Sequence, residues 1–186
     1  MATKIYIDQG HNPQNPNAGA EGNGLTEQTI TYNVGQELAT LLRQNPDFEV
    51  RLSRNDPNTV LGTSNSTSLA ARVNDANAWG ADYFISIHTN ASSNPDASGT
   101  EAFAYSRPSR AFSLGEDIVE GISAATGLRN RGMKTRPGLY VLRRTAMPAV
   151  LVELGFITNP SDAALMDSRP DLFARGIYNG IVSYIG

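Results

Sequence analysis

The segment YFISIH, at residues 83–88, constrains the fold more than any other stretch of the chain. Its apolar residues form a nearly continuous run, which is typical of a strand that is buried on both faces of a sheet. A sheet covered on both faces needs helices on each side of it. The segment therefore favours an α/β fold.

Strand-like and helical segments alternate along the rest of the chain, without an internal repeat or a linker. Apolar residues Ile30, Val34 and Leu38 recur at the spacing of one helix face, for example. This alternation predicts one α/β domain over residues 1–186, with helices covering a mostly parallel or mixed sheet. Strands are expected at 4–8, 49–53, 83–88, 99–105, 139–142 and 149–153, and helices at 26–44, 68–79, 109–126 and 171–184.

Four residues mark expected helix ends. Thr26 and Ser68 are N-cap candidates, because hydroxyl side chains can accept a hydrogen bond from the free N–H groups of a first helical turn. Gly80 and Gly127 stand where helices are expected to end, and glycine readily adopts the left-handed conformation found there.

Composition excludes several classes of protein. The 40% hydrophobic and 18% charged residues are those of an ordinary globular chain. A net charge of -3 without a dense basic block argues against nucleic acid as the main partner. The absence of cysteine removes disulfides and thiolate metal sites. No apolar stretch reaches the roughly 18 residues of a membrane span, and we expect a monomer.

The only two histidines of the chain each close a strand-like run: His11 ends KIYIDQGH and His88 ends YFISIH. Ligand sites in α/β sheets gather at the carboxyl ends of strands. Imidazole is a common zinc ligand, and a catalytic zinc typically takes three protein ligands and a water. The third ligand would have to be Asp or Glu. The alternative is that both histidines are ordinary polar or core residues.

Two glutamates are candidates for the third ligand. Glu21 lies in a glycine-rich loop, where the direction of its side chain is unconstrained. Glu27 lies in the first turn of the first expected helix, directly after the loop that carries His11. A helix start gives the side chain a defined direction, so Glu27 is the better candidate. The alternative role for Glu27 is to complement the helix dipole.

Glu153 stands within the otherwise apolar segment AVLVELGF. Carboxylates are rarely buried without a partner, and a nearby divalent cation would supply one. Beside such a cation the carboxylate could accept a proton from water and deliver it to a leaving amine. The alternative is a structural ion pair with Arg143 or Arg144.

Other polar residues have weaker signals. Asp8 could orient a ligand from behind or simply hold a strand end or turn. Arg131, Lys134 and Arg136 form a short basic stretch. That stretch either meets carboxylates of a substrate or is a solvated face.

Five segments together resemble, in their order along the chain, the zinc-dependent N-acetylmuramoyl-L-alanine amidases of bacterial cell-wall turnover. They are IDQGH at 7–11, the GA pair followed by the helix-borne Glu27, SIHTNA at 86–91, GTEAF at 99–103 and MPAVLVELGFITN at 147–159. The resemblance spans nearly the whole chain. One departure is Gln9, where the family usually has a small residue; Gln9 neighbours a ligand candidate but removes none.

The resemblance implies a single zinc amidase catalytic domain at residues 1–186, with a twisted mixed sheet of about six strands, helices on both faces and a relation to the zinc exopeptidases. It implies one Zn²⁺ held by His11, Glu27 and His88, with Glu153 as the catalytic carboxylate. The implied reaction is hydrolysis of the amide between N-acetylmuramic acid and L-alanine in peptidoglycan, as in an autolysin or endolysin.

The implied location is the cell wall or periplasm after secretion. The first residues, MATKIYIDQGH, pass directly into a strand pattern, so no signal peptide is expected within the chain, and a phage lysin or an excised domain fits as well. Two other functions stay open. One is a zinc peptidase or carboxypeptidase on a related fold, and the other is a non-catalytic wall-binding module with a structural zinc.

Overall fold

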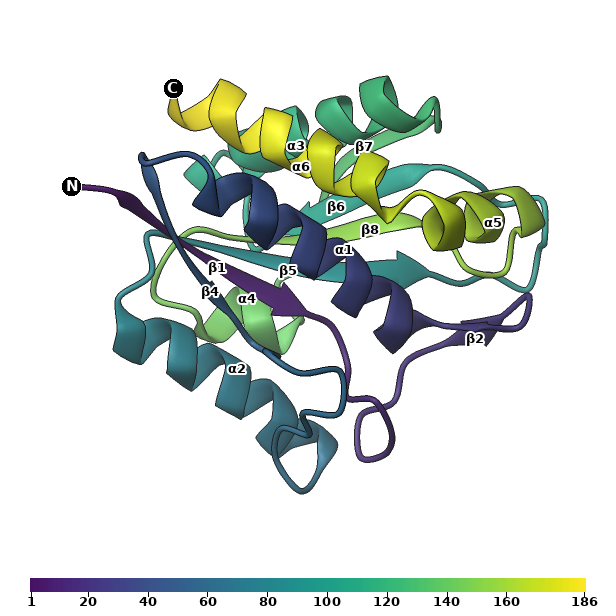
Figure 1. Cartoon of the computed structure of the whole chain (residues 1–186), viewed down its shortest axis with the longest axis horizontal. Helices are drawn as coiled ribbons and strands as arrows, with labels where there is room; N and C mark the ends of the chain where they lie inside the picture. Colours follow the sequence, from purple (N-terminus) through teal and green to yellow (C-terminus); the bar gives the residue numbers. More distant parts are fainter.

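A six-stranded sheet with the strand order β4-β1-β5-β8-β6-β7 forms the centre of the computed structural model, which describes residues 1–186 (Figure 1). Strand β6 runs antiparallel to β8, and all other neighbouring strands are parallel. The predicted mixed α/β sheet of six strands is therefore confirmed. Its strands are β1 (Thr3–Gln9), β4 (Phe48–Leu52), β5 (Tyr83–Asn90), β6 (Thr100–Ala104), β7 (Asn130–Thr135) and β8 (Ala149–Phe156), and a separate small hairpin joins β2 (Glu21–Gly22) to β3 (Leu25–Thr26).

Helices cover both faces of the sheet, as Figure 1 shows. One face carries α1 (Glu27–Arg43), α3 (Arg110–Thr126) and α6 (Pro170–Ile185), and the other carries α2 (Asn65–Trp79) and the short α4 (Tyr140–Arg144). Helix α5 (Pro160–Ser168) follows β8. None of these helices combines the length and the apolar character needed to cross a membrane.

Strand β5 packs into a different apolar cluster on each face. Ile85 and Ile87 belong to a cluster of 28 buried residues, together with residues of α1, α3 and α6. Phe84 belongs to a second cluster of 10 residues and stacks on Tyr6, with ring centroids 5.4 Å apart. Each such side chain contributes about 1.5–3 kcal/mol when fully buried. The burial of residues 83–88 on both faces is thus confirmed.

The prediction of a strand at 139–142 is wrong. Residues Tyr140–Arg144 form the helix α4, and the sixth strand is β7, which the sequence did not indicate. A short apolar run such as LYVL does not distinguish a strand from a helix by periodicity. Strand β7 lies at the sheet edge, and its sequence NRGMKT has no buried residue that would produce an apolar pattern. Helix α5 also had no counterpart among the predicted elements.

The helix ends agree with the sequence in part. Gly80 and Gly127 end α2 and α3 in the left-handed conformation, with φ values of 68° and 76°. The N-cap of α2 is Ser64, which forms a reciprocal capping box with Thr67, and not Ser68. Thr26 does occupy the N-cap position of α1, but its side chain makes no capping hydrogen bond.

Candidate functional site

Three side chains from separate elements converge at the carboxyl end of the central strands. His11 follows β1, Glu27 is the first residue of α1, and His88 lies near the end of β5. His11 Nε2 is 3.1 Å from Glu27 Oε2, and His88 Nδ1 is 3.1 Å from Glu27 Oε1. One potential ligand atom of each residue lies within 4.8 Å of the others. Glu21, the other candidate, is an exposed residue of β2 outside this cluster.

The backbone around the cluster is shaped by close approaches. A Cβ atom on Gly10 would lie 2.5 Å from His88 Cε1 and 2.6 Å from the backbone oxygen of Ile87. A Cβ atom on Gly19 would lie 2.7 Å from Glu27 Cβ and 2.9 Å from His11 Cδ2. Only glycine therefore lets the two loop segments pass this close to the cluster.

Hydrogen bonds from a second layer orient the cluster. His11 Nδ1 lies 3.2 Å from Asn17 Oδ1, and Asn17 Nδ2 in turn donates to Ser68 Oγ at 3.0 Å. Donation of the Nδ1 proton to Asn17 leaves Nε2 free to bind a cation. The sequence analysis did not identify Asn17. No motif around this residue indicates that its side-chain amide accepts a hydrogen bond from the imidazole of His11.

Glu27 is held as an ionised carboxylate. Its Oε1 accepts a hydrogen bond from the backbone N–H of Thr89, and its Oε2 accepts one from that of Ala20, both at 2.9 Å. Burial by itself would raise the pKa of Glu27, but the hydrogen bonds and charges of His11 and His88 lower this pKa well below its usual range. Burial likewise opposes a proton on His88, but Glu27 raises the pKa of that imidazole.

A buried ion pair braces the strand end from behind. Arg72 of α2 lies 2.7 Å from Asp8 Oδ1 through Nη1, and both side chains are only 1% exposed. Arg72 also donates to the backbone oxygens of Gln9 and His11, at 2.6 and 2.7 Å. Asp8 accepts a further bond from Ser86 Oγ at 2.7 Å. Asp8 therefore contacts neither imidazole directly, and it supports His11 through Arg72.

Arg72 was missed in the sequence. The only signal is an arginine within the segment LAARV, where apolar neighbours suggest the buried side of a helix. Burial would raise the pKa of Asp8, but the charge and hydrogen bond of Arg72 lower it below its ordinary value. The pair thus stays ionised inside the protein.

Glu153 lies directly beside the cluster. It is the register partner of His88 on the neighbouring parallel strand β8. Its Oε2 atom is buried and has no hydrogen-bond partner. Neither Arg143 nor Arg144 forms an ion pair with it, so the structural alternative considered for this residue is not found. Burial raises the pKa of Glu153 to about 7, and the nearby negative charges of Glu27 and Glu101 act in the same direction.

The donor atoms suit a particular kind of cation. His11, Glu27 and His88 offer two imidazole nitrogens and one carboxylate oxygen. Calcium and magnesium prefer oxygen ligands alone, whereas imidazole suits the transition metals and zinc. These three residues could therefore hold a divalent metal of the latter group, with Glu153 close by.

Comparison with known proteins identifies the family. The family model for N-acetylmuramoyl-L-alanine amidases matches residues 5–183. The chain belongs to this amidase family. It is 40% identical over 182 residues to the amidase CwlM of Bacillus licheniformis, covering 96% of this chain and 67% of that protein. It is 38% identical over 186 residues to the amidase LytC of Bacillus subtilis, covering 97% of this chain and 35% of that protein.

One of the similar proteins comes from a bacteriophage. The endolysin of Bacillus phage SPP1 is 31% identical over 186 residues, covering 97% of this chain and 64% of the endolysin. The chain thus spans between 35% and 67% of the length of these three relatives.

Solved structures of amidases share the fold. The catalytic domain of the amidase CwlV from Bacillus (Paenibacillus) polymyxa superposes with a TM-score of 0.85 at 32% identity, covering 98% of both chains. An amidase from Clostridium difficile 630 gives a TM-score of 0.88 at 30% identity, covering 99% of this chain and 97% of that one. The six-stranded sheet with its helices is therefore the fold of amidase catalytic domains.

Gln9, where the sequence was expected to depart from the family, points away from the cluster. Its Oε1 atom accepts a hydrogen bond from the backbone N–H of Arg54 at 2.9 Å, and its Nε2 donates to the backbone oxygen of Tyr32 at 3.4 Å. Its side chain also packs against α1, where a Cβ on Gly35 would lie 2.4 Å from Gln9 Cγ. Gln9 therefore braces the first helix on the opposite face of the sheet from Asp8.

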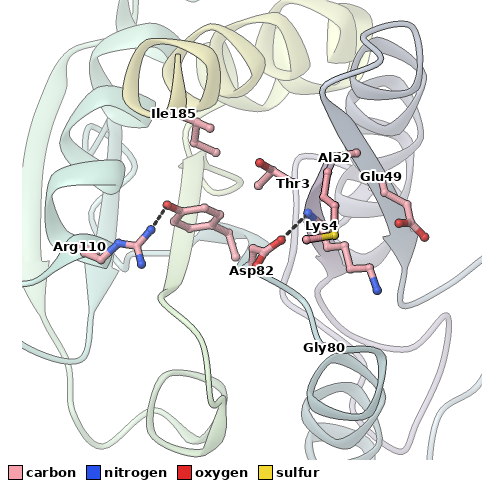
Figure 2. Close-up of a pocket in the computed structure, with 10 residues that line it drawn as sticks. Ala2, Thr3, Lys4, Glu49, Gly80, Asp82, Arg110 and Ile185 are labelled. Carbon is pink, nitrogen blue, oxygen red and sulfur yellow. Dashed lines mark hydrogen bonds between the residues drawn. The ribbon is translucent and has the colours of Figure 1, made fainter.

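The largest cavity of this family member lies at the other end of the sheet. It has a volume of about 670 Å³ and is lined by Lys4, Asp82 and Arg110, among others (Figure 2). The backbone N–H of Lys4 donates to Asp82 Oδ2 at 2.8 Å, and Arg110 donates to the hydroxyl of Tyr83. Lys4 and Tyr83 lie at the beginning of β1 and β5, whereas the histidines lie at their ends, so this cavity is separate from the site.

Proposed function

We propose that residues 1–186 form the catalytic domain of a zinc-dependent peptidoglycan amidase, which hydrolyses the amide between N-acetylmuramic acid and L-alanine. The observation that carries this proposal is the cluster of His11, Glu27 and His88 with Glu153 directly beside it, whose Oε2 atom is buried and unpaired. Membership of the amidase family supplies the bond that is cleaved.

One Zn²⁺ would be held by His11 through Nε2, by His88 through Nδ1 and by the carboxylate of Glu27. When bound, the cation supplies Lewis acidity, which polarises the scissile carbonyl and lowers the pKa of water from about 15.7 towards about 7. Three protein ligands are the usual number for a catalytic zinc. Glu153 does not belong to this cluster of donor atoms. The three ligands would therefore leave the fourth coordination position of the zinc to water.

The proton is carried by Glu153. Its carboxylate accepts a proton from the attacking water as the new C–O bond forms at the carbonyl carbon. It then donates that proton to the alanine nitrogen as the C–N bond breaks, so that the peptide leaves as a free amine. Burial raises the pKa of Glu153 above that of an exposed glutamate, which helps the carboxyl group to hold a proton between the two steps. Burial and the lack of another hydrogen-bond partner keep Oε2 available for both transfers.

We also propose a substrate, an assembly and a location for the protein. The substrate is the muramyl stem peptide of peptidoglycan, and the domain acts as a monomer on the outer side of the cell membrane, in the wall or periplasm. Three of the relatives are named an amidase, a sporulation-specific amidase and an endolysin, all consistent with action on the wall.

The test is digestion of purified peptidoglycan followed by mass spectrometry of the products. We expect peptides with a free N-terminal alanine together with intact glycan, and we expect a zinc chelator to abolish their release until zinc is restored. Cleavage within the peptide, or equal cleavage of free peptides without the sugar, would instead indicate a zinc peptidase. Zinc binding without any cleavage would indicate a wall-binding module.

A further inference from the structure

A row of side chains continues from the metal cluster towards the sheet edge. His88 of β5 and Glu153 of β8 are register partners, and Glu153 is also the register partner of Glu101 on β6. Partners on neighbouring strands project from the same face, with Cβ atoms about 4.5–5.5 Å apart in an antiparallel pair. Glu101 therefore lies beside Glu153, on the side away from the histidines.

Glu101 holds two cations of the edge strand. Its Oε1 accepts a hydrogen bond from Asn90 Nδ2 at 2.6 Å, and its Oε2 pairs with Lys134 Nζ. Arg131 Nε lies 3.5 Å from the same oxygen. The Glu101 side chain is only 7% exposed, whereas those of Arg131 and Lys134 are 29% and 46% exposed. The carboxylate therefore lies inside and the Lys134 side chain reaches the solvent, whereas Arg131 is only partly exposed, with a buried Nε and with Nη1 donating to the backbone oxygen of Ser98 at 3.3 Å.

A third cation adds to this group. Arg136 is exposed, places its guanidinium 5.2 Å from the ring centre of Phe103, and pairs with no carboxylate. Its charge lowers the pKa of Glu153, so its field reaches the reacting carboxylate. The chain contains no Asp or Glu between Gly121 and Val152. Two of the three cations thus pair with the buried carboxylate of Glu101 and Arg136 pairs with none, so the surface around Glu101 has an excess of positive charge.

We propose that Arg131, Lys134 and Arg136 form a subsite for a carboxylate on the peptide half of the substrate. The inference rests on the proposed function, which places the scissile amide beside His88 and Glu153. Strand β7 lies two strand spacings from β8, about 10 Å away. An extended peptide covers about 3.3–3.6 Å per residue. The subsite is therefore at the right distance for the carboxylate of the second or third residue of the stem peptide.

The alternative is that these cations only neutralise Glu101. One cation would be enough for that purpose, and Arg136 makes no contact with Glu101 among the ion pairs of the structure. The two explanations differ in what they predict for an uncharged substrate. A neutralising role makes hydrolysis indifferent to the charge of the peptide.

The test compares two synthetic N-acetylmuramoyl tripeptides that begin with L-alanine and continue with acidic residues. One has free carboxylates, and the other has every carboxylate converted to a primary amide of nearly the same size. We expect the wild-type zinc-loaded protein to have a kcat/KM about tenfold or more higher for the free acid, the effect of one charge-assisted hydrogen bond. The difference should lie mainly in KM and shrink at high salt.

Two variants of the subsite and one control variant test which residues are responsible. Lys134→Met and Arg136→Gln should each lower the ratio of kcat/KM for the free acid to kcat/KM for the amide towards one, mainly through a higher KM for the free acid. Arg129→Gln is the matched control, because Arg129 is exposed and forms no ion pair, and it should keep the ratio of the wild type. A wild-type ratio near one, or an unchanged ratio in both Lys134→Met and Arg136→Gln, would overturn the subsite while leaving the amidase assignment intact. Failure of the wild type to cleave either substrate would overturn both.

Discussion

His88 and Glu153 face each other across β5 and β8 as register partners, so one imidazole of the candidate metal cluster and the unpaired carboxylate project side by side from the same face of the sheet. The pairing joins residues from distant parts of the chain through backbone hydrogen bonds of two central strands. It gives the site a rigid base.

Replacing Glu153 should separate metal binding from hydrolysis. Glu153→Gln keeps the size of the side chain but cannot accept a proton, so we expect normal zinc content and a loss of hydrolysis of about 10²–10⁴-fold. Zinc is measured by elemental analysis, and activity by stem peptide released from peptidoglycan. Glu116→Gln, an exposed position on α3, is the control. Equal activity of the Glu153→Gln and wild-type proteins would remove Glu153 from the mechanism.

Replacing His88 should have the opposite pattern. His88→Ala removes one of three donors, so we expect both zinc and activity to be lost, with the fold retained in circular dichroism spectra. If the variant bound one zinc per chain after dialysis, the proposed ligand set would be incorrect.

The support of His11 by Asn17 should appear in metal affinity. Asn17→Ala removes the acceptor opposite His11 Nδ1, so the ring is free to turn and to change tautomer. We expect zinc affinity to fall about 10–100-fold, the usual effect of losing a hydrogen bond to a ligating histidine. Competition with a chromogenic chelator measures this affinity. Asn58→Ala, at an exposed loop position, should leave it unchanged.

The ion pair of Asp8 with Arg72 should make stability depend on acid pH. The pKa of Asp8 lies below its unfolded value of about 3.9, so the pair stabilises the fold at pH values above that. This stabilisation is lost as the pH falls through the lower folded value. At pH 7 we expect Asp8→Asn to cost about 3–5 kcal/mol of unfolding free energy, because Arg72 is left buried without its partner. The cost should shrink as the pH falls below about 4.

Urea denaturation between pH 3 and pH 7 measures this dependence. Asp171→Asn is the matched control, because Asp171 pairs with Arg169 at the surface and exposed pairs contribute little. A cost for Asp8→Asn that stayed constant over the whole range would show that the pair is not the source of the acid sensitivity.

Gly10 tests the close packing of the strand end. The Cβ of Gly10→Ala would collide with His88 and with the backbone oxygen of Ile87, and the backbone atom cannot move aside independently. We expect a destabilisation of about 1–3 kcal/mol and weaker zinc binding. Gly138→Ala meets no atom within 4 Å and should change neither quantity. Thermal melts with and without zinc distinguish the two variants.

Much of the site was visible in local patterns. His11 and His88 end apolar runs, Glu27 starts a periodic helix, and Glu153 interrupts an apolar strand, so each stands out against its neighbours. The errors fall where local pattern is weak. The edge strand β7 has no fully buried residue, and the apolar run at 139–142 is too short to have a clear period.

The supporting residues had no local signal. Arg72 reaches the oxygens of Gln9 and His11 from another helix, and Asn17 supports His11 from within a loop. Arg72 is distant in sequence from the residues that it contacts, and Asn17 lies in an irregular loop. The periodicity of apolar side chains predicts neither kind of contact.

The amino-acid sequence by itself determined the alternation of strands and helices and the supply of donors: two histidines, no cysteine and a few glutamates in conspicuous places. Only the tertiary structure decided that Glu153 stands beside His88 without a partner, and that cations of the edge strand gather around Glu101. The physical reason is that hydrophobic periodicity is a local property of the chain, whereas the register between strands is set by the packing of the whole sheet against its helices.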